Sequence, residues 1–377
     1  MNINTKILHG YPMIDDHTGA SSIPKVQAST YHQSDLSQKQ KYTYSRFGNP
    51  TVEALETAVA ALENGEFSTA FSSGVAAISS VLLQLSAGDH IVLCQNIYGG
   101  TYQIVMDLLD KFNIEYTFVE ETPTSNWSDV IRKNTKMIYM ETPSNPTLRI
   151  TDIKSVATIA KRNDIITVCD NTFMTPYYQN PLDLGVDIVI HSGTKFLNGH
   201  SDVVAGLVIT NSSILHQKIV NQRTLLGGIL GVEDAWLLMR GIKTLGIRME
   251  RSEHNTLLIA SFLNRSNKVK KVYHPSLNSH KGRKIHIKQA RGFGSVLSFE
   301  LENVDAVESF LSKVTIPLVG VSLGGVETIL SYPWTMSHAG LSEEKRLSRG
   351  VTPELIRLSG GIEDVADLIM DMEQVLQ

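Results

Sequence analysis

Between about residues 52 and 233, short apolar runs alternate with segments whose apolar residues recur at helical spacing. Each run is bounded by Gly, Asn, Asp or Ser, which is typical of a buried strand. This alternation predicts an α/β fold with a mostly parallel sheet covered by helices on both faces. The expected strands are 68–72, 90–95, 116–119, 137–140, 165–170, 187–191 and 207–210, and the expected helices are 52–63, 75–85, 101–112, 127–133 and 152–162.

The pattern changes after about residue 233. One long helix is expected over 234–263, then a smaller α+β unit in which 282–292 is a polar loop. Residues 1–50 lack periodicity and are rich in Ser, Thr, Gln and Tyr, which indicates an extended arm that packs on another surface. We therefore expect three parts: an arm (1–50), a large domain (51–240) and a smaller C-terminal domain (241–377).

Composition narrows the class of protein. The 377 residues carry a formal net charge of −4, and the pI is near 6.3, so a general basic surface for nucleic acid is excluded. Both cysteines, Cys94 and Cys169, lie in apolar runs, which predicts reduced buried thiols and no cysteine-rich metal site. The sequence contains neither a signal-like apolar run at its start nor a membrane-spanning run. We expect a cytoplasmic protein without metal, nucleic-acid or membrane partners.

Candidate chemistry follows the expected strands, because ligands of such sheets bind beyond the carboxyl ends of the strands. Ser192-Gly-Thr194-Lys195 comes directly after strand 187–191. A lysine at the mouth of an apolar sheet is suited to Schiff-base chemistry, and the hydroxyls beside it can hold a phosphate. The alternative is a surface lysine in a polar loop.

Three further segments have a functional and a structural interpretation. Asp170 ends an apolar strand, where a carboxylate needs a cation, although it could simply cap the next turn. Ser72-Ser73-Gly74-Val75 begins a helix and could bind a phosphate, as many helix starts can. Tyr44-Ser45-Arg46 could bind phosphate through the guanidinium, or the arginine could be solvated.

Together these segments resemble the fold-type I, pyridoxal-phosphate-dependent enzymes of cysteine and methionine metabolism. That family includes cystathionine γ-synthase, cystathionine lyases, methionine γ-lyase and O-acetylhomoserine sulfhydrylase. The resemblance covers nearly the whole chain, and its further motifs are Thr5 to Gly10, Glu141-Thr-Pro-Ser-Asn145-Pro146, Asp170-Asn-Thr172-Phe, Gly199-His200-Ser-Asp202, Ser322-Leu-Gly-Gly-Val-Glu327 and Leu355 to Ser359. It implies an α/β fold-type I transferase with an N-terminal arm and a smaller α+β C-terminal domain.

The resemblance also implies residue roles. Lys195 forms the Schiff base with pyridoxal 5'-phosphate and later takes the Cα proton, and Asp170 pairs with the ring nitrogen. Tyr98 stacks on the ring and handles the leaving-group proton. The remaining cofactor contacts are Gly74, Val75, Thr172, Ser192 and Thr194, with Tyr44 and Arg46 reaching the phosphate from a neighbouring subunit, and the substrate contacts are Arg357, Asn145 and Ser322.

The arm therefore implies at least an active-site dimer, and relatives are usually tetramers of two such dimers. The implied reaction is α,γ- or α,β-elimination on a sulfur amino acid, which releases a thiol or sulfide, a 2-keto acid and ammonia.

The substrate is less well defined. Relatives that handle cystathionine typically carry charged residues where this chain has Thr43, Gln103 and Val321, so a neutral tail is expected, as in methionine, homocysteine or cysteine. Gly100 replaces a cysteine usual in methionine γ-lyases, which keeps cystathionine cleavage as an alternative, with a synthase or sulfhydrylase as a further one. Gly193 and Gly360 also depart from the family, without an explanation from sequence.

Overall fold

The computed structural model describes residues 1–38 and 40–376. Its largest feature is a seven-stranded sheet with the strand order β1-β7-β6-β5-β4-β2-β3. Strands β2 to β6 pair in parallel, whereas β7 is antiparallel to both β6 and β1. The strands are β1 (Phe67–Phe71), β2 (His90–Cys94), β3 (Glu115–Val119), β4 (Thr135–Glu141), β5 (Ile166–Asp170), β6 (Ile188–Ser192) and β7 (Gly206–Thr210). The expected mostly parallel sheet is confirmed.

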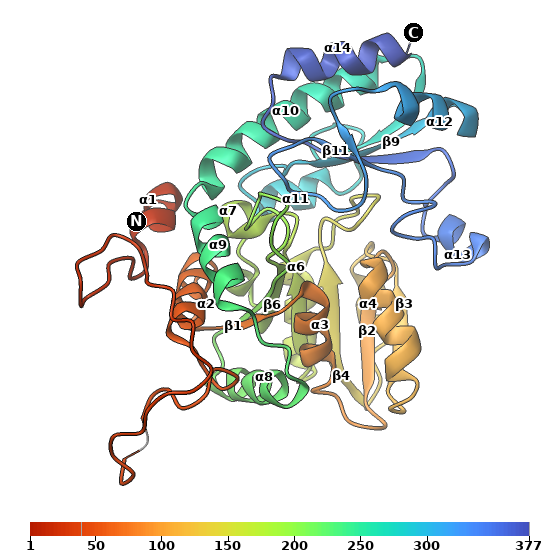
Figure 1. Ribbon diagram of the computed structural model, residues 1–377. Helices are drawn as coiled ribbons and strands as arrows, with labels where there is room; N and C mark the ends of the chain where they lie inside the picture. Colours follow the sequence, from red (N-terminus) through yellow and green to blue (C-terminus); the bar gives the residue numbers. More distant parts are fainter. Residues whose placement is uncertain (39, 377) are drawn as a thin grey trace.

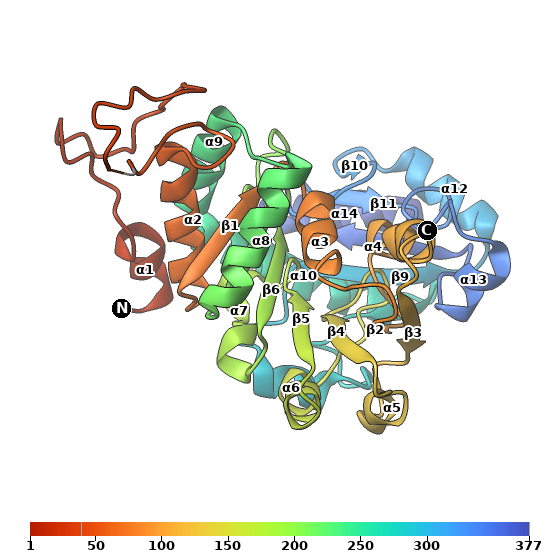
Figure 2. The same ribbon diagram turned by 90° about the horizontal axis from the view of Figure 1, so that it is seen from below.

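Helices cover both faces of this sheet (Figures 1 and 2). Asn49 caps the helix that follows it by accepting hydrogen bonds from the amides of Thr51 and Val52, and Pro50 suits the first helical position. Ser73 and Asp152 cap two further helices in the same way. The helices up to residue 265 are α2 (Pro50–Leu62), α3 (Gly74–Leu82), α4 (Gly99–Ile104), α5 (Ser125–Asp129), α6 (Ile153–Arg162), α7 (Thr175–Tyr178), α8 (Ser213–Leu226), α9 (Val232–Ile242) and α10 (Leu245–Arg265), with a π-helical turn η1 (Val105–Leu109) and a 3-10 turn η2 (Pro181–Leu184).

The C-terminal part forms a second sheet with the order β10-β11-β12-β9-β8. Helices α10, α12 and α14 pack against it around a separate apolar cluster that includes Phe299, Phe310 and Leu358. Its elements are β8 (Val269–Tyr273), α11 (Arg283–Gln289), β9 (Val296–Leu301), α12 (Val304–Lys313), β10 (Leu318–Val319), β11 (Ile329–Ser331), α13 (Glu343–Ser348), β12 (Leu355–Ser359) and α14 (Val365–Leu376).

The arm is extended for most of its length and projects beside α2 (Figure 1). Its first turns form α1 (Ile3–His9), in which Ile7 is buried in the main core together with Tyr11. Further along, Tyr44 and Phe47 are exposed. The start of the arm therefore packs on its own chain, while its later part presents aromatic side chains to the outside.

Three sequence predictions were wrong in detail. The stretch 234–263 contains two helices, α9 and α10, because the helix is interrupted at Lys243 and Thr244. This interruption lies close to the domain boundary expected at 240–241. Segment 282–292 contains α11, which the burial of His286 stabilises despite its polar sequence. The expected helix 101–112 is α4 followed by the π-helical turn η1. Helix α8 was not predicted.

The structure also bears on the cysteines, on membrane-spanning helices and on metal-binding groups. Cys94 and Cys169 are buried free thiols, as predicted. No helix in residues 1–38 and 40–376 is long and apolar enough to cross a membrane. The same residues contain no group of three or more His, Cys, Asp or Glu side chains placed to hold a metal ion.

Candidate active site

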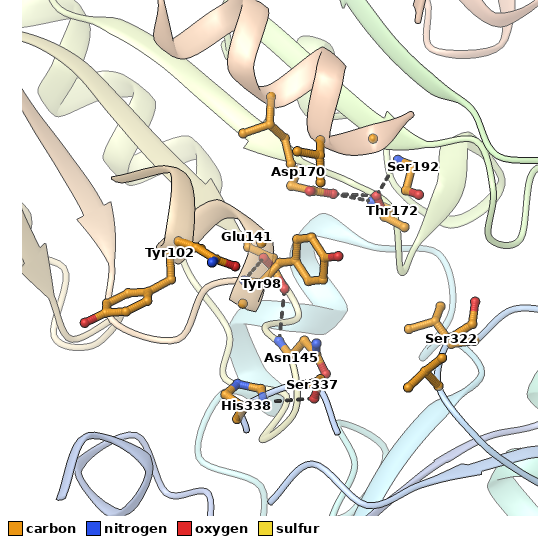
Figure 3. A pocket seen from close by; sticks show the side chains of 18 of the residues that line it. Tyr98, Tyr102, Glu141, Asn145, Asp170, Thr172, Ser192, Ser322, Ser337 and His338 are labelled. Carbon is orange, nitrogen blue, oxygen red and sulfur yellow. Dashed lines mark hydrogen bonds between the residues drawn. The ribbon is translucent and has the colours of Figure 1, made fainter. Parts of the chain in front are cut away.

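The main cavity, of about 750 Å³, opens where β2, β4, β5 and β6 end and is closed from the other side by the C-terminal part. Figure 3 shows side chains from both parts pointing into it. Most residues predicted from the sequence line this cavity: Gly74, Val75, Tyr98, Gln103, Asn145, Asp170, Thr172, Ser192, Thr194, Lys195, Val321, Ser322 and Arg357. Because parallel strands end at one edge of a sheet, residues distant in sequence meet there.

Lys195 lies in the turn after β6. Its Nζ donates a hydrogen bond of 2.7 Å to the Ser322 hydroxyl. Burial, and then the positive charge of Arg357, lower the pKa of Lys195 to about 8. The amine is therefore a better nucleophile near neutral pH than an ordinary lysine.

Asp170 ends β5 and is 8% exposed. Its Oδ1 accepts hydrogen bonds from the Thr172 amide at 3.0 Å and the Thr172 hydroxyl at 2.5 Å. Burial raises the pKa of this carboxyl above its ordinary value. In the described part of the chain it has no ion-pair partner. A buried carboxylate of this kind calls for a cation from a bound molecule.

The N-terminus of α3 is suited to an anion. The first amides of a helix have no partner within that helix, so those of Gly74 and Val75 are available to a phosphate. A side chain at Gly74 would place its Cβ 3.1 Å from the Ser192 hydroxyl oxygen. Glycine therefore allows the start of α3 to lie close to Ser192. Thr194 lines the same cavity and adds a second hydroxyl.

A buried arginine reaches the cavity from the second sheet. Arg357, on β12, is 3% exposed, and burial lowers its pKa to about 10, so it keeps its charge at neutral pH. Its guanidinium donates to the Asn145 Oδ1 at 3.0 Å and to the Ser331 hydroxyl at 2.8 Å. Its Nε is buried without a partner among the described atoms. A planar guanidinium held in this way suits a substrate carboxylate.

Tyr98 lies at the start of α4, and its ring points into the cavity (Figure 3). Its amide donates to the Glu141 Oε2 at 2.7 Å. Burial is the main cause that raises the pKa of Tyr98 above its ordinary value. Because the phenol keeps its proton near neutral pH, the side chain can donate a proton or stack on an aromatic ligand.

The arm residues predicted to bind phosphate (Tyr44 and Arg46) or substrate (Thr43) do not reach the cavity of their own chain. Thr43, Tyr44 and Arg46 are absent from its lining. Arg46 instead donates to the Thr224 carbonyl at 3.2 Å and lies 4.9 Å from the Phe47 ring. Their contribution to a neighbouring subunit stays a prediction.

Other lining residues were missed from the sequence. Glu141, which ends β4, lines the cavity together with Asp107, His338 and Lys345. Burial, and then the charge of Arg349, lower the pKa of His338 to about 4. The end of an apolar strand could have singled out Glu141, whereas no local pattern singles out Asp107 or Lys345.

Packing accounts for the two unusual glycines. A Cβ at Gly193 would lie 3.0 Å from a Leu238 methyl group and 3.1 Å from the Ala205 Cβ. A Cβ at Gly360 would overlap the Thr256 hydroxyl. Both positions are therefore crowded, and Gly360 in particular leaves no room for a side chain.

These groups fit pyridoxal 5'-phosphate, because they combine an amine of lowered pKa, a buried carboxylate, a helix start suited to a phosphate and an arginine suited to a carboxylate. Fold and site thus define a fold-type I, pyridoxal-phosphate-dependent enzyme. Residues 4–377 match the family of Cys/Met metabolism PLP-dependent enzymes, and the chain belongs to that family.

Named relatives lie within this family. The chain is 49% identical over 375 residues to the cystathionine beta-lyase MetC of Bacillus subtilis, covering 100% of this chain and 96% of the relative. It is 44% identical over 340 residues to the L-methionine gamma-lyase of Fusobacterium nucleatum, covering 89% and 86%. The crystal structure of cystathionine gamma-lyase from Lactobacillus plantarum complexed with L-serine superimposes with a TM-score of 0.97 at 40% identity, covering 100% and 98%.

Proposed function

We propose that this enzyme is a carbon–sulfur lyase that eliminates a thiol or sulfide from a sulfur amino acid with a neutral tail, such as methionine, homocysteine or cysteine. The observation that carries the reaction is Lys195, a buried amine with a lowered pKa that shares one cavity with Asp170 and Arg357. The family and the relatives named as lyases support the same reaction class.

Bound pyridoxal phosphate supplies an electron sink for a carbanion at Cα. Asp170 holds a proton on the ring nitrogen, and Gly74, Val75, Ser192 and Thr194 bind the phosphate. Arg357 orients the substrate carboxylate with Asn145. Lys195, oriented by the Ser322 hydroxyl 2.7 Å away, accepts the Cα proton. Tyr98 donates a proton to the departing sulfur: a sulfur on Cβ leaves after the Cα proton is lost, whereas a sulfur on Cγ leaves only after a further proton has been lost from Cβ.

The neutral tail is inferred from two uncharged positions of the cavity lining where relatives that handle cystathionine typically carry charges. These positions are Gln103 and Val321. Thr43 belongs to the arm, which we propose crosses to the cavity of a partner subunit. Unpaired charges on a substrate would be costly beside such residues, so the pocket favours an uncharged thioether or thiol.

Cystathionine cleavage is the second candidate, and Asp107 and Lys345 favour it. Both line the cavity, and within the described residues neither has an ion-pair partner. The Lys345 ammonium lies 5.8 Å from the centroid of the Tyr102 ring. Opposite charges in the cavity lining suit the second ammonium and carboxylate of cystathionine.

A substrate panel decides between the two. The holoenzyme is assayed with methionine, homocysteine, cysteine and cystathionine for keto acid and released thiol. A neutral-tail lyase prefers the first three, whereas a preference of more than about tenfold for cystathionine establishes the second candidate. In that case Asp107→Asn and Lys345→Met lower kcat/KM for cystathionine alone. The matched controls Asp110→Asn and Lys111→Met change exposed charges outside the cavity. A holoenzyme that cleaves none of the four contradicts the proposed reaction.

We also propose a homo-oligomer, at least an active-site dimer and by family analogy a tetramer, in the cytoplasm. The exposed Tyr44 and Phe47 support an arm that packs on a partner subunit. The two buried thiols suit a reducing compartment.

A further inference from the structure

Glu141 stands out because it is buried in the cavity wall and has no role in the chemistry described above. It ends β4 and is 5% exposed. Its strand register places it opposite Asp170. Burial, and then the negative charge of Asp170, raise the pKa of Glu141 well above its ordinary value. Keeping a carboxyl group here has an electrostatic cost, so packing alone does not explain it.

The two oxygens of Glu141 bind the main chain of two different loops. Oε2 accepts the Tyr98 amide at 2.7 Å, and Oε1 accepts the Asn145 amide at 3.1 Å (Figure 3). Tyr98 follows β2 and begins α4, whereas Asn145 follows β4 itself. A carboxylate accepts at both oxygens, which makes it the side chain suited to two converging N–H donors.

Each loop carries a side chain that the proposed reaction needs. The Tyr98 ring projects into the cavity, and the Asn145 Oδ1 accepts a hydrogen bond from Arg357 at 3.0 Å. Glu141 thus connects Tyr98, which we expect to stack on the cofactor ring, to Asn145 and Arg357, which we expect to bind the substrate carboxylate. Small errors in such a distance are costly, because a displacement of about 1 Å can reduce a rate by about 100-fold.

We propose that Glu141 is a positioning residue that fixes Tyr98 relative to the Asn145–Arg357 pair, so that ring and substrate carboxylate are held in one geometry. The inference rests on the proposed function for the identity of those two groups. The hydrogen bonds that Glu141 accepts from the Tyr98 and Asn145 amides support the positioning role.

The chain offers a matched control in Glu121. This side chain is 1% exposed, and its Oε1 accepts the Asn96 amide at 2.9 Å. Its Oε2 accepts the amide group of the same Asn96 side chain at 3.4 Å. Glu121 is therefore an equally buried acceptor next to the same loop. Its Oε2 also lies 3.5 Å from the Arg149 guanidinium, but within the described residues Glu121 accepts no main-chain amide from a second loop and does not line the cavity.

The experiment compares Glu141→Gln with Glu121→Gln in the holoenzyme. Glutamine keeps the shape but turns one acceptor into a donor, so one of the two N–H groups loses its partner. We measure kcat/KM for elimination, the Kd of glycine from the change in visible absorption, and the Tm. For Glu141→Gln we expect kcat/KM to fall about 10- to 100-fold and the Kd of glycine to rise about 10-fold. For Glu121→Gln both stay within about threefold of wild type, and the two variants lose similar amounts of Tm.

Equal effects of the two substitutions on kcat/KM and glycine binding would overturn the proposal, as would a Glu141→Gln enzyme that matches wild type. If Glu141→Gln does not fold, Glu141→Asp is measured instead. If neither variant folds while Glu121→Gln does, Glu141 has a structural role, and this result also overturns the proposal. Glycine has no sulfur to eliminate. A wild-type enzyme that binds glycine but cleaves no carbon–sulfur bond therefore defeats the proposed function, while the glycine comparison still decides the role of Glu141.

Discussion

The Lys195 ammonium nitrogen lies 2.7 Å from the hydroxyl oxygen of Ser322, and this hydrogen bond joins the two parts of the chain across the cavity. Lys195 follows the central sheet, whereas Ser322 belongs to the loop between the C-terminal strands β10 and β11. The Ser322 carbonyl also accepts a hydrogen bond from Arg357 at 2.5 Å. One residue therefore orients both the proposed base and the proposed carboxylate-binding group.

Removing the Ser322 hydroxyl should lower kcat. In Ser322→Ala the amine loses the group that orients it, and we expect a loss of about tenfold, comparable to one hydrogen bond. Steady-state kinetics with the preferred substrate measure this. Because Ser322 has a φ of 87°, Ser322→Gly removes the hydroxyl while relaxing the backbone and should lose as much activity. Full activity in both variants would exclude the orienting role.

The lowered pKa of Lys195 predicts how cofactor attachment depends on pH. Only the neutral amine attacks the aldehyde, so the rate of pyridoxal phosphate uptake by the cofactor-free protein should rise with pH and level off above about 8. The growth of the visible absorption band measures this rate. Lys195→Ala should bind no cofactor covalently and form no such band. A rate that keeps rising toward pH 10 would contradict the lowered pKa.

Acidic side chains at positions 43 and 321 should change substrate preference. The double variant Thr43→Glu/Val321→Glu restores the charges typical of cystathionine-handling relatives. We expect the ratio of kcat/KM for cystathionine to that for methionine to rise at least about tenfold, because the added carboxylates can pair with the distal ammonium. Val319→Glu, on exposed β10 and outside the cavity, is the control. An unchanged ratio in the double variant would show that these positions do not select the substrate.

The arm should act on a neighbouring subunit. Arg46→Ala and Lys195→Ala are each expected to be nearly inactive as pure proteins. When they are mixed and refolded together, half of the dimers contain both variants, and each of these has one intact site. Activity should therefore recover to about a quarter of wild type. If Arg46 served its own chain, the mixture would stay as inactive as its components.

Acid should destabilise the protein through its buried histidines. Burial lowers the pKa of His286 from 6.5 to about 4, so the unfolded chain takes up a proton in a range where the folded chain does not. The contribution of the neutral His286 to the free energy of unfolding is fully present above pH 6.5 and is lost as the pH falls toward 4. This loss amounts to about 3 kcal/mol. The Tm of His286→Gln should depend less on pH in this range. His9→Gln, at an exposed position, should follow wild type.

Several features of the site could be predicted from local sequence because they follow apolar strands. Asp170 ends β5 and Lys195 lies in the turn after β6, and parallel neighbouring strands bring their carboxyl ends together. The start of α3 at Gly74 could also be predicted, since Ser73 is a favourable cap. Helix α11 was missed because its stability depends on burying His286, which no local pattern reveals.

By itself, the sequence determined the mostly parallel sheet, the Schiff-base lysine candidate and the family, because these depend on hydrophobic periodicity and on motifs along one stretch of chain. Only the tertiary structure decided which distant groups share the cavity. Arg357 meets Asn145 across 212 positions, Glu141 binds two loops at once, and Asp107 and Lys345 line the same cavity. Contacts of this kind follow from how the second sheet packs over the first, and local hydrophobic patterning does not encode that packing.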